Sequence, residues 1–180
     1  MIQIFDYADK FNFGFSFGCI ENIEKILKLK SCCGLFPDCT HPKIQTHPYL
    51  LDENIEHFKL LKETFLLSVE KYINKNFKYS FLHSWCYKNK KGQQMTEFNW
   101  HNHKEKDLDT KGINEISGLF YLNDTEFGTE FETEDYFLRI KPKKYIWYLW
   151  PSSMYHRPEP GISNNDRYTI AASIGVIDNN

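Results

Sequence analysis

The chain has 180 residues and a net charge of −2, and 17% of its residues are aromatic. This length predicts one domain with a sizeable core, and the near-neutral charge argues against a nucleic-acid-binding protein. The absence of a membrane-length apolar stretch or a signal-peptide pattern predicts a soluble, cytoplasmic protein that does not enter membranes, of unspecified oligomeric state.

The first 78 residues are predicted to form a helical support. Alternating apolar residues over 1–20 indicate short strands, and apolar spacing over 21–30 indicates a short amphipathic helix. Residues 51–76 indicate a longer helix with Asp52 as its N-cap. Its apolar stripe comprises Ile55, Phe58, Leu61, Phe65, Val69, Tyr72 and Ile73.

Residues 79–178 are predicted to form a β-rich core. Aromatic and β-branched residues dominate 79–91, 94–103, 116–124, 128–140, 144–151 and 167–177, and turn signals separate these stretches. The pattern predicts a mainly β protein with N-terminal helices, built as a jelly-roll or cupin-like barrel. No internal repeat or long linker divides the chain, so residues 1–180 are predicted to form a single domain.

Three histidines are candidate metal ligands. His101 and His103 stand two apart in a predicted strand, which points both imidazoles to the same face and suits cis ligation of one ion. Taken alone, such a pair is more typical of surface or hydrogen-bonded histidines. His156 follows a strongly apolar strand and a tight turn, from which it can return across a barrel as the third ligand.

Arg167 is the charged residue in an otherwise apolar predicted strand. A guanidinium that points into a barrel needs an anionic partner, since burying it unpaired is costly. Thr169 shares its face of the strand and adds a hydroxyl donor. The alternative is an exposed arginine at the start of the strand.

These segments together resemble a known superfamily. SWCYKNKKGQQMTEFNWHNH, ISGLFYLND, GTEF, WPSSMYHRPEPG and RYTIAAS occur in the order seen in 2-oxoglutarate/Fe(II)-dependent oxygenases, over roughly residues 80–175. Within them the pattern is similar to a group of bacterial and phage proteins with H-x-H-P…SG-x-YY…FPS…H…R-x-S. The resemblance implies a double-stranded β-helix with iron at its mouth, bound by His101 and His156. It also implies that Arg167, Thr169 and Tyr121 bind the distal carboxylate of 2-oxoglutarate.

The second iron ligand is where the sequence departs from the superfamily. The usual motif has a carboxylate at the position of His103, although the most similar group also carries histidine there. Three neutral imidazoles would leave the iron and its ligands at +2, which favours an anionic cosubstrate. In a second register, His103 and Glu105 form the ligand pair instead.

The resemblance implies a hydroxylase that uses Fe(II), 2-oxoglutarate and O2 and releases succinate and CO2, acting on an unidentified small-molecule or amino-acyl substrate. One alternative is a cupin-like three-histidine dioxygenase without 2-oxoglutarate. Another is a non-enzymatic jelly-roll binding or virion module.

The cysteines give a weaker signal. Their number, five, is odd, which argues against a disulfide framework. Cys32, Cys33, Cys39 and His41 can also be interpreted as a structural zinc site, but they lack the paired C-x2-C spacing of a zinc knuckle.

Overall fold

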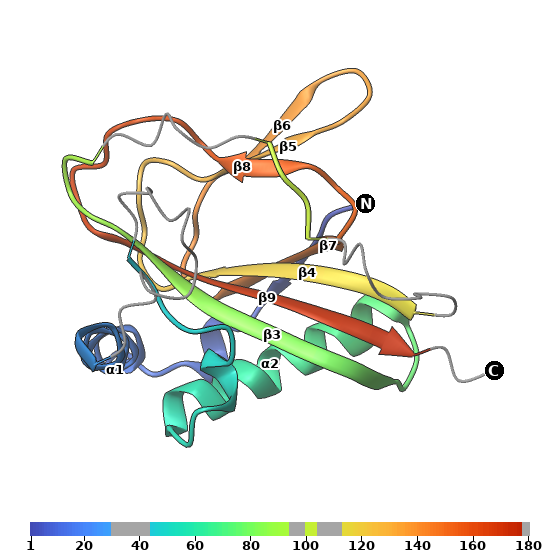
Figure 1. Cartoon of the computed structure of the whole chain (residues 1–180), viewed down its shortest axis with the longest axis horizontal. Helices are drawn as coiled ribbons and strands as arrows, with labels where there is room; N and C mark the ends of the chain where they lie inside the picture. The colour runs from blue at the N-terminus through green and yellow to red at the C-terminus, as the bar shows by residue number, and fades with distance from the viewer. Residues whose placement is uncertain (30–43, 94–99, 104–112, 178–180) are drawn as a thin grey trace.

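Two antiparallel sheets form the framework of the protein (Figure 1). The computed structural model describes residues 1–29, 44–93, 100–103 and 113–177. The larger sheet has the order β1 (Gln3–Asp6), β7 (Ile146–Pro151), β4 (Ile113–Tyr121), β9 (Arg167–Ile177), β3 (Lys78–Asn89) and β2 (Ile44–Gln45). The smaller sheet has the order β6 (Phe137–Ile140), β5 (Thr129–Glu132) and β8 (His156–Pro158).

The helices cover one face of the larger sheet, and the smaller sheet lies over part of the other face (Figure 1). These helices are α1 (Phe15–Leu29) and α2 (Glu56–Ile73), and short 3₁₀ turns occur at Ala8–Lys10 and Leu50–Asp52. Within the described ranges, no helix is long and apolar enough to cross a membrane.

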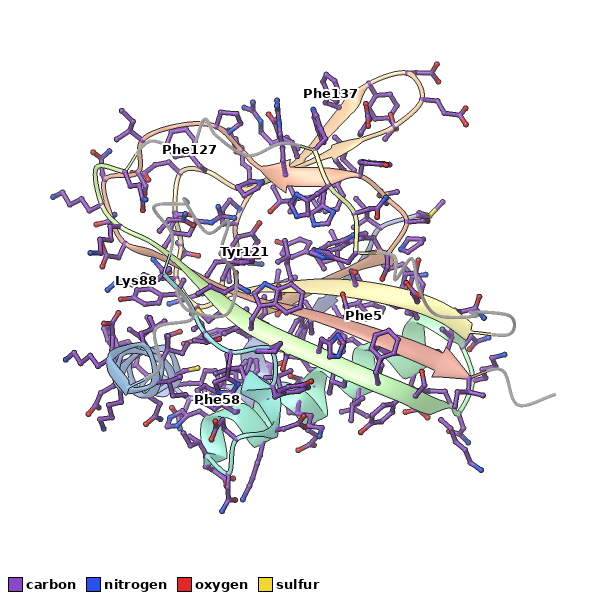
Figure 2. The ribbon with its side chains drawn as sticks, in the orientation of Figure 1. Phe5, Phe58, Lys88, Tyr121, Phe127 and Phe137 are labelled. Atoms are coloured by element: carbon purple, nitrogen blue, oxygen red, sulfur yellow. The ribbon has the colours of Figure 1, made fainter. Side chains whose placement is uncertain are left out.

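One hydrophobic cluster lies between the helices and the larger sheet. The buried stripe of α2 supplies Phe58, Leu61, Phe65 and Val69, and the Phe65 ring centre lies 4.9 Å from that of Trp147 on β7. A second cluster lies on the opposite face of the sheet and includes Trp85, Tyr121, Phe131, Trp150 and Ala171. Figure 2 shows Phe58 on the helical side and Tyr121 on the side of the smaller sheet.

The central strand β9 contributes to both clusters. Its residues alternate between the faces of the sheet, with Ile170, Ala172 and Ile174 toward the helices and Ala171 in the second cluster. Only its last residue is exposed. The predicted strand over 167–177 is therefore confirmed, and it brings Arg167 and Thr169 between the two sheets.

The prediction of strands over residues 1–20 is wrong beyond β1. Helix α1 begins at Phe15, six residues before the predicted start. The reason is a four-residue repeat of buried side chains, which is a helical period: Phe15, Cys19, Ile23 and Leu27. Phe13 and Phe17, which suggested a strand by their alternation, are 93% and 73% exposed.

Helix α2 confirms the predicted buried stripe but not the predicted start. It begins at Glu56, and its N-cap residue is Ile55, which makes no side-chain capping hydrogen bond. Asp52 instead lies in the preceding 3₁₀ turn and binds the Lys62 ammonium at 2.6 Å. The long helix is stabilised by tertiary burial of its apolar face rather than by an N-cap.

The β region differs from the predicted strands in three places. The stretch 128–140 forms the hairpin of β5 and β6, because Thr133 and Tyr136 close a tight turn through backbone and side-chain hydrogen bonds. Strand β8 follows a turn and has only three residues, which is too short to show a two-residue alternation in the sequence. Of the predicted strand 94–103, residues 94–99 lie outside the described residues, and residues 100–103 form a single β-bridge between His101 and His156 rather than a strand.

Candidate metal centre

The structure brings His101, His103 and His156 together between the two sheets. One ligand nitrogen from each lies within 4.8 Å of the others. The two Nε2 atoms of His103 and His156 are 3.2 Å apart. Two ligands at about 2.1 Å from an ion and at right angles to each other are about 3.0 Å apart. The spacing therefore suits two adjacent ligands of one metal ion.

Backbone hydrogen bonds fix the relative position of these histidines. The N–H of His101 donates to the carbonyl of His156 at 3.1 Å, and the N–H of His156 donates back to the carbonyl of His101 at 2.9 Å. The N–H of His103 donates to the carbonyl of Ser152 at 3.0 Å. This short antiparallel pairing holds a segment before β4 against the start of β8, so residues distant in sequence meet.

The pKa of His103 and the position of His156 Nδ1 suit metal binding. Burial lowers the pKa of the His103 imidazole to about 4, and charge on His101 acts in the same direction. His103 is therefore neutral at pH 7, as a metal ligand must be. His156 Nδ1 lies 3.2 Å from the Met154 carbonyl, and a proton on Nδ1 leaves the Nε2 lone pair free for a metal.

Aromatic side chains form the walls around the histidines. The Trp85 ring lies edge-on to His103 at 5.3 Å, and Trp150 lies edge-on to His156 at 5.0 Å. Phe131 stacks on His156 at 5.7 Å. These contacts restrict the orientations of the imidazole rings and surround them with apolar surface.

Trp100 lies on a different surface from the histidines. It stacks on Phe137 of the β5–β6 hairpin and beneath the Arg157 guanidinium, away from the pocket lining. The outward position of Phe137 is visible in Figure 2.

A single pocket joins the histidine cluster to Arg167. It encloses about 440 Å³ of empty space, including open solvent at its mouth. The Arg167 side chain is buried, its Nη2 donates to the Gly128 carbonyl at 3.1 Å, and its guanidinium lies 5.3 Å from the centre of the Tyr121 ring. The lining is formed by Tyr87, Asn89, His101, His103, Leu119, Thr129, His156, Pro158, Arg167, Thr169 and Ala171.

The other predicted cosubstrate residues have different positions. Thr169 lines the pocket beside Arg167, as its place on the strand predicts. Tyr121 is completely buried and does not line the pocket. Its hydroxyl forms a hydrogen bond with Thr129 Oγ1 at 2.6 Å, and the Arg167 guanidinium lies over its ring, 5.3 Å from the ring centre. Tyr121 therefore contacts the predicted anchor rather than the pocket space.

Three polar residues of the pocket lining were not among the predicted site residues: Tyr87, Asn89 and Thr129. Tyr87 pairs with Thr169 and Asn89 with Arg167 across the β3–β9 ladder, which places all four on one face. Two-residue alternation along 79–91 could have identified Tyr87 and Asn89, but only once the pairing partner of that strand was known.

Two predictions lie outside the described residues. Glu105, the alternative ligand, belongs to the stretch 104–112, and the cysteine cluster with His41 belongs to 30–43. Both remain predictions.

Comparison with known proteins supports the architecture. No family model and no curated protein matches the sequence. HygX from Streptomyces hygroscopicus, solved with nickel and 2-oxoglutarate bound, is 11% identical with a TM-score of 0.66, covering 97% of this chain and 82% of HygX. A Pseudomonas putida prolyl-4-hydroxylase is 10% identical with a TM-score of 0.64, and the match covers 98% of this chain and 93% of that enzyme. A Trichoplax adhaerens prolyl hydroxylase, solved in complex with a hypoxia-inducible-factor peptide, is 13% identical with a TM-score of 0.64. The match covers 98% of this chain and 83% of that enzyme.

This chain has a double-stranded β-helix fold. Identities this low establish the fold alone. In this double-stranded β-helix, the histidine cluster and Arg167 line one pocket, so any reaction must be argued from those side chains.

Proposed function

We propose that the protein is a non-haem Fe(II)- and 2-oxoglutarate-dependent dioxygenase that hydroxylates its substrate and releases succinate and CO2. One observation carries this proposal: a three-histidine cluster and a buried arginine line the same pocket of a double-stranded β-helix. The chemistry of those two groups matches the two halves of a metal-chelating, dicarboxylate cosubstrate.

The histidines fit a divalent iron ion. They offer three nitrogen ligands on one side, which leaves the other coordination positions open for small molecules. Three neutral ligands leave the ion at its full +2 charge, which favours a dianionic cosubstrate. When bound, Fe(II) and 2-oxoglutarate supply the oxidising chemistry that uses O2.

Arg167 fits the distal carboxylate of 2-oxoglutarate. A guanidinium presents a planar set of donors that can bind a carboxylate through two hydrogen bonds. At 2% exposure it is shielded from solvent, so its attraction for an anion is screened less than that of a surface arginine. Thr169, on the same wall, adds a hydroxyl donor. A cupin-like dioxygenase that uses no keto acid has no evident use for this arginine.

The aromatic walls around the histidines affect the solvation of the metal site. Trp85, Phe131 and Trp150 surround the imidazoles, which limits water around the reacting centre and lowers the local dielectric constant.

The substrate itself is proposed to be a small molecule or an amino-acyl group. HygX has been solved with hygromycin B and the Trichoplax enzyme with a peptide, so the fold accommodates both kinds of ligand in those proteins.

Slow turnover of 2-oxoglutarate in the absence of a substrate would test this function. We expect purified protein with Fe(II), 2-oxoglutarate and air to form succinate, because bound 2-oxoglutarate can be oxidised slowly even when no substrate is bound. Succinate measured by mass spectrometry should disappear when Fe(II) is replaced by Zn(II) or when O2 is removed. Equal succinate in those controls, or none in the complete mixture together with no binding of 2-oxoglutarate, would refute the proposal.

A further inference from the structure

Glu159 is a buried carboxylate that lies next to the pocket without lining it. Its side chain is 7% exposed and lies in the loop between β8 and β9. One carboxylate oxygen, Oε2, accepts the N–H of Gly128 at 2.8 Å. The other, Oε1, lies 3.0 Å from Nη1 of Arg139 on β6.

The backbone of Glu159 binds the same glycine. Its N–H donates to the Gly128 carbonyl at 3.0 Å, so both polar groups of Gly128 are held by one residue. Gly128 also has no space for a side chain, because a Cβ atom there would lie 1.7 Å from the Ile140 carbonyl oxygen. The peptide at Gly128 is therefore fixed in position on several sides.

The Gly128 carbonyl is also the acceptor for Arg167. Nη2 of the guanidinium donates to it at 3.1 Å, so the chain of contacts runs from Glu159 through Gly128 to Arg167. A neighbouring contact joins the same two loops, because the Phe127 ring fills the space beside Gly161. The loop before β5 and the loop before β9 are thus packed together where the arginine begins its strand.

We propose that Glu159 is a positioning residue that sets the orientation of the Arg167 guanidinium for carboxylate binding. The assignment rests on the proposed function, because 2-oxoglutarate supplies the carboxylate. Two-point recognition of a carboxylate depends on the angle of the guanidinium plane, so loss of the support behind it weakens binding without removing a direct contact. Arg139 is 56% exposed, and such an ion pair alone contributes little to stability.

Glu126 provides a matched control for Glu159. It is an exposed carboxylate that joins the same two loops by accepting hydrogen bonds from Ser163 Oγ at 3.1 Å and Asn164 Nδ2 at 3.2 Å. Its carboxylate makes those loop contacts without binding the Gly128 amide. Replacing either residue with alanine removes one negative charge and the carboxylate contacts that it makes, but only the change at Glu159 removes a contact to Gly128, the acceptor of Arg167.

The test compares Glu159→Ala, Glu159→Gln and Glu126→Ala in the nickel-loaded protein. We expect Glu159→Ala to raise the dissociation constant of 2-oxoglutarate by roughly tenfold or more, the effect of losing one supporting hydrogen bond, with the nickel dissociation constant unchanged. Glu159→Gln keeps an oxygen for the Gly128 N–H and should recover most of the affinity. Both constants are measured by titration calorimetry, and Glu126→Ala should match the wild type.

Hydrogen exchange at the Gly128 amide gives a readout independent of 2-oxoglutarate. Faster exchange in Glu159→Ala than in Glu126→Ala is expected. If the wild type binds 2-oxoglutarate and Glu159→Ala binds it equally well, the positioning role is wrong while the proposed function stands. If the wild type itself does not bind 2-oxoglutarate, both fail. A loss of nickel affinity equal to the loss of 2-oxoglutarate affinity would indicate a general structural role and would also overturn the assignment.

Discussion

Replacing His156 with alanine should weaken Ni(II) or Fe(II) binding by more than about a hundredfold and abolish succinate formation. Loss of a supporting residue around a metal typically costs 10–100-fold in affinity, and loss of a ligand should exceed that. The backbone of residue 156 still exchanges two hydrogen bonds with His101, so alanine should leave the strand pairing in place. Metal affinity is measured by calorimetry, and folding is checked by thermal unfolding.

His57 is a suitable control for this experiment. It lies on α2, contacts Phe15 and Asn22, and is remote from the pocket lining. His57→Ala should retain full metal affinity. Undiminished metal binding by a folded His156→Ala variant would show that the three histidines are not the metal site.

Replacing Arg167 with methionine should raise the KM for 2-oxoglutarate by about a hundredfold or more while leaving metal affinity nearly unchanged. Truncating one partner of a buried charge pair costs about 2–5 kcal/mol, and each 1.4 kcal/mol is a factor of about ten in affinity. Methionine fills a similar volume but offers no hydrogen-bond donor. Initial rates of succinate formation over a range of 2-oxoglutarate concentrations measure the effect.

Arg157→Met serves as the comparison for this variant. Arg157 lies over the Trp100 ring and pairs with Glu130, and it does not line the pocket. The KM for 2-oxoglutarate should change little in that variant. A similar KM for Arg167→Met and the wild type would show that another group binds the distal carboxylate of 2-oxoglutarate.

The parts of the fold that depend on regular spacing were predictable from sequence. The stripe of α2 follows the helical period over many residues, and burial in the structure agrees with it. Strand β9 was predicted from its apolar and β-branched composition, and it is buried on both faces. The start of α1 was not predictable by alternation, because Phe13 and Phe17 are exposed and Phe15 is buried. Two-residue and four-residue spacings coincide in that stretch, and only the tertiary packing separates them.

In the candidate site, too, some residues could be predicted from sequence and others depend on tertiary contacts. The three histidines and Arg167 could be proposed as a site because they occur in an ordered set of segments that resembles one superfamily, and because Arg167 is the charged residue of an apolar strand. Glu159 and Gly128 could not, since the role proposed for Glu159 depends on a contact between two loops that are distant in sequence. Tyr87 and Asn89 required the pairing of β3 with β9, which no single-strand pattern reveals.

Diffraction from crystals grown anaerobically with Fe(II) and 2-oxoglutarate, recorded at the iron absorption edge, tests the central claim most directly. We expect one anomalous peak about 2.1 Å from a nitrogen of each of His101, His103 and His156, with the distal carboxylate of 2-oxoglutarate on Arg167. A peak bound by His103 and Glu105 without His101 would replace the ligand set. Iron away from His156, or a 2-oxoglutarate molecule that does not reach Arg167, would contradict the account.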